Sequence, residues 1–399
     1  MTTFLPHPPT EPDRLPTGLA RRVSAPVDTD RSTAAATRIL EALRAEPALL
    51  RRDLGRRTQL SPATVTRTTA GLIRAGLVRE QPDGAALGGK GRPANPLALV
   101  ENRHVCIGVH LGRTTITVAA GDLRGRVLAQ RRVRNVDYRG DFVAATAREA
   151  GRVLDAFLDR ELVSAGLVAP WQALGLAQET VARRMEAAFD VPLATGDHVE
   201  AIVAAEVVRR PPPPGLTCYL YARNVSGFAL VLSTGTRTEI SRTADLTHLP
   251  TGSAVECSCG RTGCFEVSVG ERAVLTRALR DGIITRPDPA ELDRAARRGD
   301  REAFATVQRR AACIGRAAAL VRGMHDPDRF VLLGQAIPTM PSAVAMLRRT
   351  LRLTSGPGPI DVVVSDATDS VQATAACAVA LRPVYDDPAA LTAGQAAAG

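Results

Sequence analysis

The sequence predicts an α/β protein with a small basic N-terminal domain and a larger body in which strands and helices alternate. The composition supports a folded chain, because 45% of the 399 residues are hydrophobic and 23% are charged. Apolar residues recur at helical spacing up to about residue 80, whereas strand-like runs alternate with helical segments from residue 100 onward. The Pro-rich stretch RRPPPPG at 209–215 divides the body and predicts lobes at 100–210 and 211–385.

The charge distribution and the N-terminal sequence limit the classes of protein to which the chain can belong. No apolar run reaches the roughly 18 residues that span a bilayer, and the N-terminus lacks the pattern of a signal peptide. We therefore expect a cytoplasmic protein without membrane contact. Residues 31–100 carry twelve basic and five acidic residues, a net +7 of the total +10. Such a segment favours a polyanionic partner, although a solvated surface is the simpler alternative.

The first elements are three predicted helices and a strand. Residues 1–31 hold six prolines and are expected to be a disordered lead-in. A helix from Ser32 to Pro47 follows, and a short one covers about 50–57. In LSPATVTRTTAGLIRAGLV, Ser61 and Pro62 are a favourable cap and first-turn residue for a third helix. Gly76 ends that helix, and residues 77–79 begin a strand.

A basic hairpin completes this domain. Its far side reads GGKGRPANPLALV, in which Lys90 and Arg92 precede Pro93. Two short helices, a third that exposes hydroxyl groups and arginine, and a basic hairpin predict a winged helix-turn-helix at 32–99. A helical domain used only for packing is the alternative.

The expected partner of this domain is double-stranded DNA. Two recognition helices of a dimer would enter successive major grooves of a palindromic operator. Lys90 and Arg92 would reach the minor groove, which favours A/T-rich flanks. Four arginines of the second helix would contact phosphate or nothing, and so would contribute salt dependence: Arg51, Arg52, Arg56 and Arg57. The predicted DNA-binding residues of the third helix are Ser61, Ala63, Thr64, Thr66 and Arg67.

The body from residue 100 has the pattern of an α/β fold. Residues 104–133 predict three strands joined by turns around Gly112 and around 123–125. Helices are expected at 142–160, 178–189 and 198–208, and mainly helical structure at 271–325. Strands are expected at 217–224 and 227–235, while 329–334 and 360–366 predict buried strands of a partly parallel sheet. Residues 386–399 are expected to be a loose tail.

Three cysteines are clustered in CSCGRTGCF. The spacing Cys257-x-Cys259-x4-Cys264, with His248 nine residues upstream, is a Cys3His set suited to tetrahedral zinc. A disulfide is the alternative, and it is disfavoured by the expected compartment and by the closeness of Cys257 to Cys259. Four protein ligands close a zinc site, so the metal would be structural. The other cysteines are expected to be buried small apolar residues: Cys106, Cys218, Cys313 and Cys377.

These residues carry a resemblance to a known family. HLPTGSAVECSCGRTGCFE resembles the zinc loop of the ROK family, which contains sugar-responsive bacterial repressors and sugar kinases, and KGRP resembles the wing of its repressor branch. The resemblance extends from about residue 33 to 385. It implies a two-lobed, actin-like body of the sugar kinase type, with the C-terminal helix returning to the first lobe. It also implies a homodimer or homotetramer.

The resemblance also implies that the chain is not an enzyme. The Asp-x-Gly-Gly-Thr phosphate turn of the kinases stands here as HLGRTT, with His110 at the carboxylate and Arg113 at the second glycine. The other two glycine-rich turns keep only Gly227 and Gly334. The position of the catalytic base is His198, although phosphoryl transfer to a sugar hydroxyl uses a carboxylate. A sugar kinase is the remote alternative.

The resemblance points to a regulator with an altered effector site. The candidate effector-binding residues are His198, Asp245 and Glu266. The family has a sugar-facing loop at the place that follows residue 177 here, and this sequence lacks that loop. We expect a DNA-binding transcriptional regulator, a repressor of carbohydrate-related or other metabolic genes, controlled by a sugar or another small molecule. The alternative is an effector-independent DNA-binding or partner-binding protein with a vestigial cleft.

Overall fold

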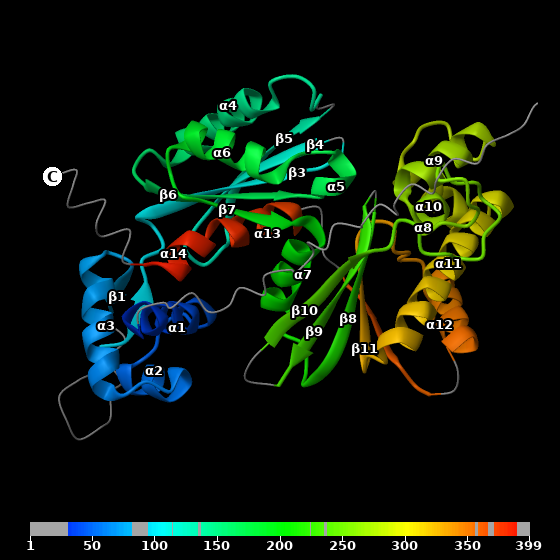
Figure 1. Ribbon diagram of the computed structural model, residues 1–399. Coiled ribbons are helices and arrows are strands. Elements are labelled where there is room, and N and C mark those ends of the chain that lie inside the picture. Colours follow the sequence, from blue (N-terminus) through cyan, green and yellow to red (C-terminus); the bar gives the residue numbers. More distant parts are fainter. Residues whose placement is uncertain are drawn as a thin grey trace, which may run out of the picture.

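The computed structural model describes residues 31–81, 95–113, 115–134, 137–223, 225–234, 238–355, 358–365 and 371–388. Figure 1 shows a small helical domain beside a body of two lobes, each built on a five-stranded sheet. Within these residues, no helix combines the length and the apolar character that crossing a bilayer requires.

The N-terminal domain consists of three helices and a two-stranded sheet. The helices are α1 (Arg31–Ala45), α2 (Arg51–Thr58) and α3 (Pro62–Arg74), and β1 (Val78–Glu80) pairs antiparallel with β2 (Leu97–Leu99). Ile39, Leu40 and Leu43 of α1 are fully buried, as their helical spacing predicts. Lys90 and Arg92 of the expected wing lie outside the described residues.

The first lobe has a mixed sheet in the order β5-β4-β3-β6-β7. Strands β3 (His104–Leu111), β4 (Thr115–Gly121) and β5 (Val127–Arg134) are antiparallel, and β6 (Glu161–Ala169) and β7 (Leu193–Asp197) continue parallel to β3. Helices α4 (Phe142–Leu154) and α6 (Gln178–Phe189) cover one face, with the short α5 (Trp171–Leu174) beside them (Figure 1). The 3₁₀ turn η2 (Asp155–Phe157) follows α4 in the chain.

The other face of this sheet is covered by a helix from the end of the chain. Helix α13 (Val371–Ala380) packs on β3, β4 and β6 (Figure 1). The contact requires glycine, because a Cβ on Gly108 would lie 2.5 Å from the Ala376 carbonyl carbon and one on Gly166 would lie 2.3 Å from the Ala380 nitrogen. The short helix α14 (Arg382–Asp386) then contacts α1 of the N-terminal domain.

The second lobe has a sheet in the order β10-β9-β8-β11-β12. It follows α7 (His198–Arg209), whose apolar side chains share one buried cluster with side chains of α13 and of this sheet. Strands β8 (Gly215–Ala222), β9 (Ser226–Ser233) and β10 (Thr238–Asp245) form a meander, and β11 (Arg329–Leu333) and β12 (Asp361–Val364) are parallel to β8. The helices are α8 (Phe265–Val269), α9 (Glu271–Arg280), α10 (Pro289–Arg297), α11 (Arg301–His325) and α12 (Pro341–Ser355).

The predicted α/β class with a winged helix ahead of a two-lobed body is confirmed, and several details differ. Strand β7 and helices α5 and α12 were not predicted. The helix expected over 142–160 ends at Leu154, and η2 follows it. Strand β6 was not predicted, because its run ELVSAGLVA mixes small residues with apolar ones and is buried on both faces. Strand β10 was also missed, because TEISRTAD is a polar edge strand without clear alternation.

Candidate functional site

Helix α3 presents the predicted DNA-reading residues on one end and one face. Ser61 caps the helix: its hydroxyl accepts a hydrogen bond from the Thr64 backbone N–H at 3.2 Å. Ser61, Ala63, Thr66 and Arg67 are exposed, and Thr64 is half-buried. Val65, Thr69 and Leu72 are buried on the opposite face. The N-terminal half of α3 is therefore open to a partner.

Because of this cap, replacing Ser61 with alanine should lower the free energy of unfolding by about 1 kcal/mol. Chemical denaturation of the purified protein measures the change. Ser61→Asp, which keeps a cap acceptor, serves as the matched control and should retain most of the stability. An alanine variant as stable as the wild type would show that the cap contributes nothing.

All four α2 arginines, which were expected to contact phosphate or nothing, have carboxylate partners on the protein itself. Arg51 lies 2.6 Å from Glu80 and Arg57 lies 2.8 Å from Glu46, while Arg56 pairs with Asp53. Arg52 is the most loosely held, 3.9 Å from Asp53. Exposed ion pairs of this kind contribute little stability, so they can open when a phosphate approaches.

The four predicted metal ligands come together in one loop of the second lobe. The ligand atoms of His248, Cys257, Cys259 and Cys264 all lie within 4.8 Å of one another. The sulfur of Cys257 is 3.8 Å from His248 Nδ1, and the sulfurs of Cys259 and Cys264 are 3.6 Å apart. Tetrahedral zinc with Zn–S bonds of about 2.3 Å separates its sulfurs by roughly 3.8 Å. The donor set therefore fits the metal.

The backbone holds this loop in a fixed shape. Gly263 has a φ of +71°, and a Cβ there would lie 2.5 Å from the Ser253 carbonyl oxygen, so the position requires glycine. The Thr251 hydroxyl donates to the Gly263 carbonyl at 2.9 Å. A hydrogen bond from Arg261 lowers the pKa of Cys259 to about 6, which favours the thiolate form that binds metal.

A buried pair of histidines lies where the two lobes meet. His110 Nε2 and His198 Nδ1 are 2.6 Å apart, and the His198 ring packs edge-on against Tyr221. Burial lowers the pKa of His110 to about 3 and lowers that of His198 well below its ordinary value. Both rings are therefore neutral near pH 7, and one N–H donates to the other ring. His198, a predicted effector residue, is only 4% exposed in this arrangement.

The carboxylate beside His198 has a structural partner of its own. Asp197 precedes α7 as its cap, and its Oδ1 accepts from the backbone N–H groups of Val199 and Glu200 at 2.9 and 3.4 Å. Burial raises the pKa of Asp197. The carboxyl group that comes closest in sequence to the catalytic-base position of the kinases thus serves to begin a helix.

The other two predicted effector residues lie at one turn beside the metal loop. Asp245 is exposed and accepts from the Thr247 N–H at 2.6 Å, while the Glu266 N–H donates to the Thr247 carbonyl at 3.0 Å. Glu266 is also ion-paired with Arg113 of the first lobe at 2.9 Å. In the sequence, Arg113 stands out only as the residue at a lost glycine position. In the structure, it joins the first lobe to Glu266, two residues after Cys264.

Comparisons with known proteins agree with this architecture. A model of the ROK family matches residues 106–382, and a model of the MarR family matches residues 32–86. A transcriptional regulator of Mycobacterium tuberculosis is 30% identical over 386 residues, which cover 90% of this chain and 87% of the relative. The DNA-binding transcriptional dual regulator NagC of Escherichia coli is 23% identical over 71% of this chain and 76% of its own length.

Solved structures show the same fold. A ROK family transcriptional regulator described as a homologue of the E. coli MLC protein superimposes with a TM-score of 0.71 at 21% identity, covering 89% of this chain and 97% of its own. A ROK glucokinase from Streptomyces griseus, solved with glucose and AMPPNP, gives 0.57 at 18% identity and covers 69% of this chain and 99% of its own.

The structure of the regulator covers 89% of this chain, whereas that of the kinase covers 69%. The relatives that match over most of the chain are transcriptional regulators, and the DNA-binding domain stands ahead of the body. The chain belongs to the ROK family, as one of its DNA-binding transcriptional regulators rather than one of its kinases.

Proposed function

We propose that this regulator is a repressor that binds a palindromic operator as a homodimer or homotetramer in the cytoplasm, holds a structural zinc, and responds to a small-molecule effector. The observation that carries the proposal is the arrangement of α3. Its N-terminal half is capped, exposed and rich in hydroxyl groups, with Arg67 on the open face. Such a surface can read base edges and contact phosphate oxygens. Ser61, Ala63, Thr64, Thr66 and Arg67 are the proposed contacts, with Lys90 and Arg92 on the wing.

The zinc would be held by His248, Cys257, Cys259 and Cys264. When bound, it supplies four bonds that cross-link the loop and no catalytic chemistry, because no ligand position is left for water. The loop continues from Cys264 directly into α8, where Phe265 is fully buried and Glu266 faces Arg113. The chain's own residues thus connect the metal loop to the first lobe.

Regulation would act on the relation between the two lobes. The Arg113–Glu266 ion pair crosses from one lobe to the other, and the neutral His110–His198 pair is buried where the lobes meet. An effector that binds between the lobes at this point would displace Glu266 from Arg113 or bind beside them. It controls DNA binding only if it has different affinities for the two lobe arrangements. Glu266, Asp245 and His198 are the proposed effector residues.

The proposal is tested by fluorescence anisotropy of the full-length protein on DNA from upstream of its own gene. Binding should resist competitor DNA, weaken steeply between two salt concentrations, and be released by one member of a panel of sugars and sugar phosphates. Arg113→Ala should change the concentration of effector needed for release and leave operator affinity within about threefold.

The outcomes separate the alternatives. Specific binding that no compound alters would favour the effector-independent regulator. The absence of specific binding would contradict the assignment of α3. ATP-dependent phosphorylation of a sugar would support the kinase alternative, which the arginine at the phosphate turn and the histidine at the base position both disfavour.

A further inference from the structure

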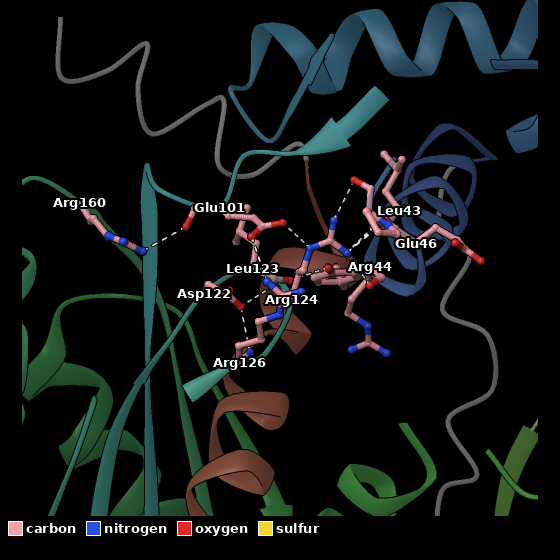
Figure 2. A network of polar contacts seen from close by, with 11 residues as sticks. Leu43, Arg44, Glu46, Glu101, Asp122, Leu123, Arg124, Arg126 and Arg160 are labelled. Carbon is pink, nitrogen blue, oxygen red and sulfur yellow. Dashed lines mark hydrogen bonds and ion pairs between the residues drawn. The ribbon is translucent and has the colours of Figure 1, made fainter. Parts of the chain in front are cut away.

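The contact between the DNA-binding domain and the first lobe is centred on one buried arginine. Arg124 lies in the turn between β4 and β5 and extends to the C-terminal end of α1 (Figure 2). Its Nη1 donates to the carbonyl oxygens of Leu43, Arg44 and Glu46 at 2.9, 2.8 and 3.2 Å, and its Nη2 donates to that of Pro47 at 3.2 Å. Only 6% of the Arg124 side chain is exposed.

Elementary physical chemistry explains this position of the guanidinium. The last four carbonyls of a helix have no partner within the helix, and this end carries a partial negative charge. A guanidinium offers five N–H donors in a planar fork. The Nε of Arg124 donates to Glu101 Oε1 at 2.5 Å, and this hydrogen bond lowers the pKa of Glu101. Glu101 lies in the segment that links β2 to β3, so Arg124 binds both the helix and the linker.

The turn that carries Arg124 is itself held in place. Asp122 Oδ1 accepts from the backbone N–H groups of Arg124 and Arg126, each at 2.9 Å (Figure 2). The Tyr385 hydroxyl of α14 donates to the Leu123 carbonyl at 2.7 Å. The Thr37 hydroxyl of α1 donates to the Tyr385 carbonyl at 2.6 Å. The turn, the end of the chain and α1 therefore form one connected network.

Two further contacts extend the junction to α3. Apolar side chains of the N-terminal domain share one buried cluster with Cys106, Leu123 and Val384 of the first lobe and α14. His104 Nε2 lies 3.3 Å from the carbonyl oxygen of Gly76, which follows the last turn of α3. The DNA-binding domain therefore contacts the first lobe at the C-terminal ends of both α1 and α3. Arg124 is the only residue of the described chain whose side chain bonds four backbone carbonyls of this domain.

We propose that Arg124 is a positioning residue for DNA recognition, which fixes the angle at which the winged helix sits on the first lobe. In an assembly of two chains this angle sets the distance and rotation between the two copies of α3. The body thereby decides which half-site spacing the protein accepts, and Arg124 contributes this selectivity without touching DNA. The inference goes beyond the proposed function, and it rests on the two-half-site operator in that proposal.

The test measures the preference for half-site spacing. Full-length wild type and variants each select binding sites from a random DNA pool, and affinities are then measured for the selected site with one base pair added or removed. One base pair rotates a half-site by roughly 34°. Wild type should bind the altered sites about tenfold or more weakly than the selected site. Arg124→Ala should bind the altered sites about threefold or less more weakly than the selected site. Affinity for an isolated half-site should stay within about twofold.

The matched control is Arg126→Ala. This variant removes the same charge from the same turn, but the Arg126 side chain is 65% exposed and, among the residues that the structure describes, is bonded to Glu101 alone. It should keep the spacing preference of wild type. Arg124→Lys keeps the charge without the planar fork and should give an intermediate preference. If Arg124→Ala does not fold, as circular dichroism would show, Arg124→Lys carries the same test.

Hydrogen exchange provides a second readout that does not depend on DNA. Backbone amides at 43–49 and 97–103 should exchange faster in Arg124→Ala than in Arg126→Ala, because the end of α1 and the linker lose their partner. An Arg124→Ala protein with the wild-type spacing preference would overturn the proposal. If the wild type binds all half-site spacings with equal affinity, the two-half-site operator is contradicted instead. If hydrogen exchange in Arg124→Ala is also unchanged, the role of Arg124 is overturned as well.

Discussion

Cys259→Ser should release the metal and destabilise the second lobe. Metal content, measured by elemental analysis of protein purified without chelator, should fall from about one zinc per chain to nearly none, because a hydroxyl is a poor replacement for a thiolate ligand. The midpoint of thermal unfolding should fall by several degrees, and size-exclusion chromatography should show altered assembly. Cys259 is exposed, so the change leaves no buried cavity that could explain the loss.

Ser258→Ala is the matched control, since Ser258 is an exposed neighbour in the same loop and offers no ligand to the cluster. It should keep both the metal and the wild-type unfolding midpoint. Treating the wild type with a strong chelator should reproduce the effect of Cys259→Ser. A Cys259→Ser protein with full zinc content and unchanged unfolding would show that Cys259 is not a ligand.

The second large effect is expected at Arg67. Arg67→Ala should weaken operator binding by about tenfold to a hundredfold, the range for a lost base or paired phosphate contact of about 1–3 kcal/mol. Its exposed position on α3 means that the fold should be unaffected. Anisotropy titrations on operator and on unrelated DNA measure the ratio of specific to non-specific affinity, and circular dichroism checks the helix content.

Arg74→Ala controls for the loss of charge, because Arg74 is exposed in the last turn of the same helix. It should change affinity for both DNAs by a similar small factor. If Arg67 contacts only phosphate, Arg67→Ala should weaken both DNAs equally and reduce the salt dependence by about one ion. Unchanged operator affinity would remove Arg67 from the DNA-reading face.

The elements predicted correctly from sequence are those whose signals are local. Ser61, Pro62 and Gly76 mark the ends of α3 within a few residues of the helix itself. The grouping of His248 with the three cysteines could be predicted because Cys257, Cys259 and Cys264 lie within eight positions and the histidine is close by. In both cases the chain needs no distant partner to adopt its conformation, so the pattern carries the information.

The contacts that were missed join distant parts of the sequence. His110 and His198 are 88 positions apart, and Arg124 is 80 positions from Arg44. Nothing in HLGRTT indicates that Arg113 pairs with Glu266 of the other lobe. Likewise the arginine in the turn DLRGR looks like an ordinary exposed turn residue until the domain packs against it. Such pairings depend on the topology of the whole fold.

The position of α13 and α14 has a consequence for synthesis of the protein on the ribosome. The first-lobe sheet is built from residues 104–197, but one of its faces is covered by residues 371–380, and Tyr385 binds α1. A nascent chain therefore exposes an apolar sheet face until almost its whole length has emerged, when chaperone contact is most useful. An incompletely translated chain also lacks the Tyr385 contacts that join α1 to the turn of Arg124. Only nearly full-length chains can then compete for the operator in the native geometry.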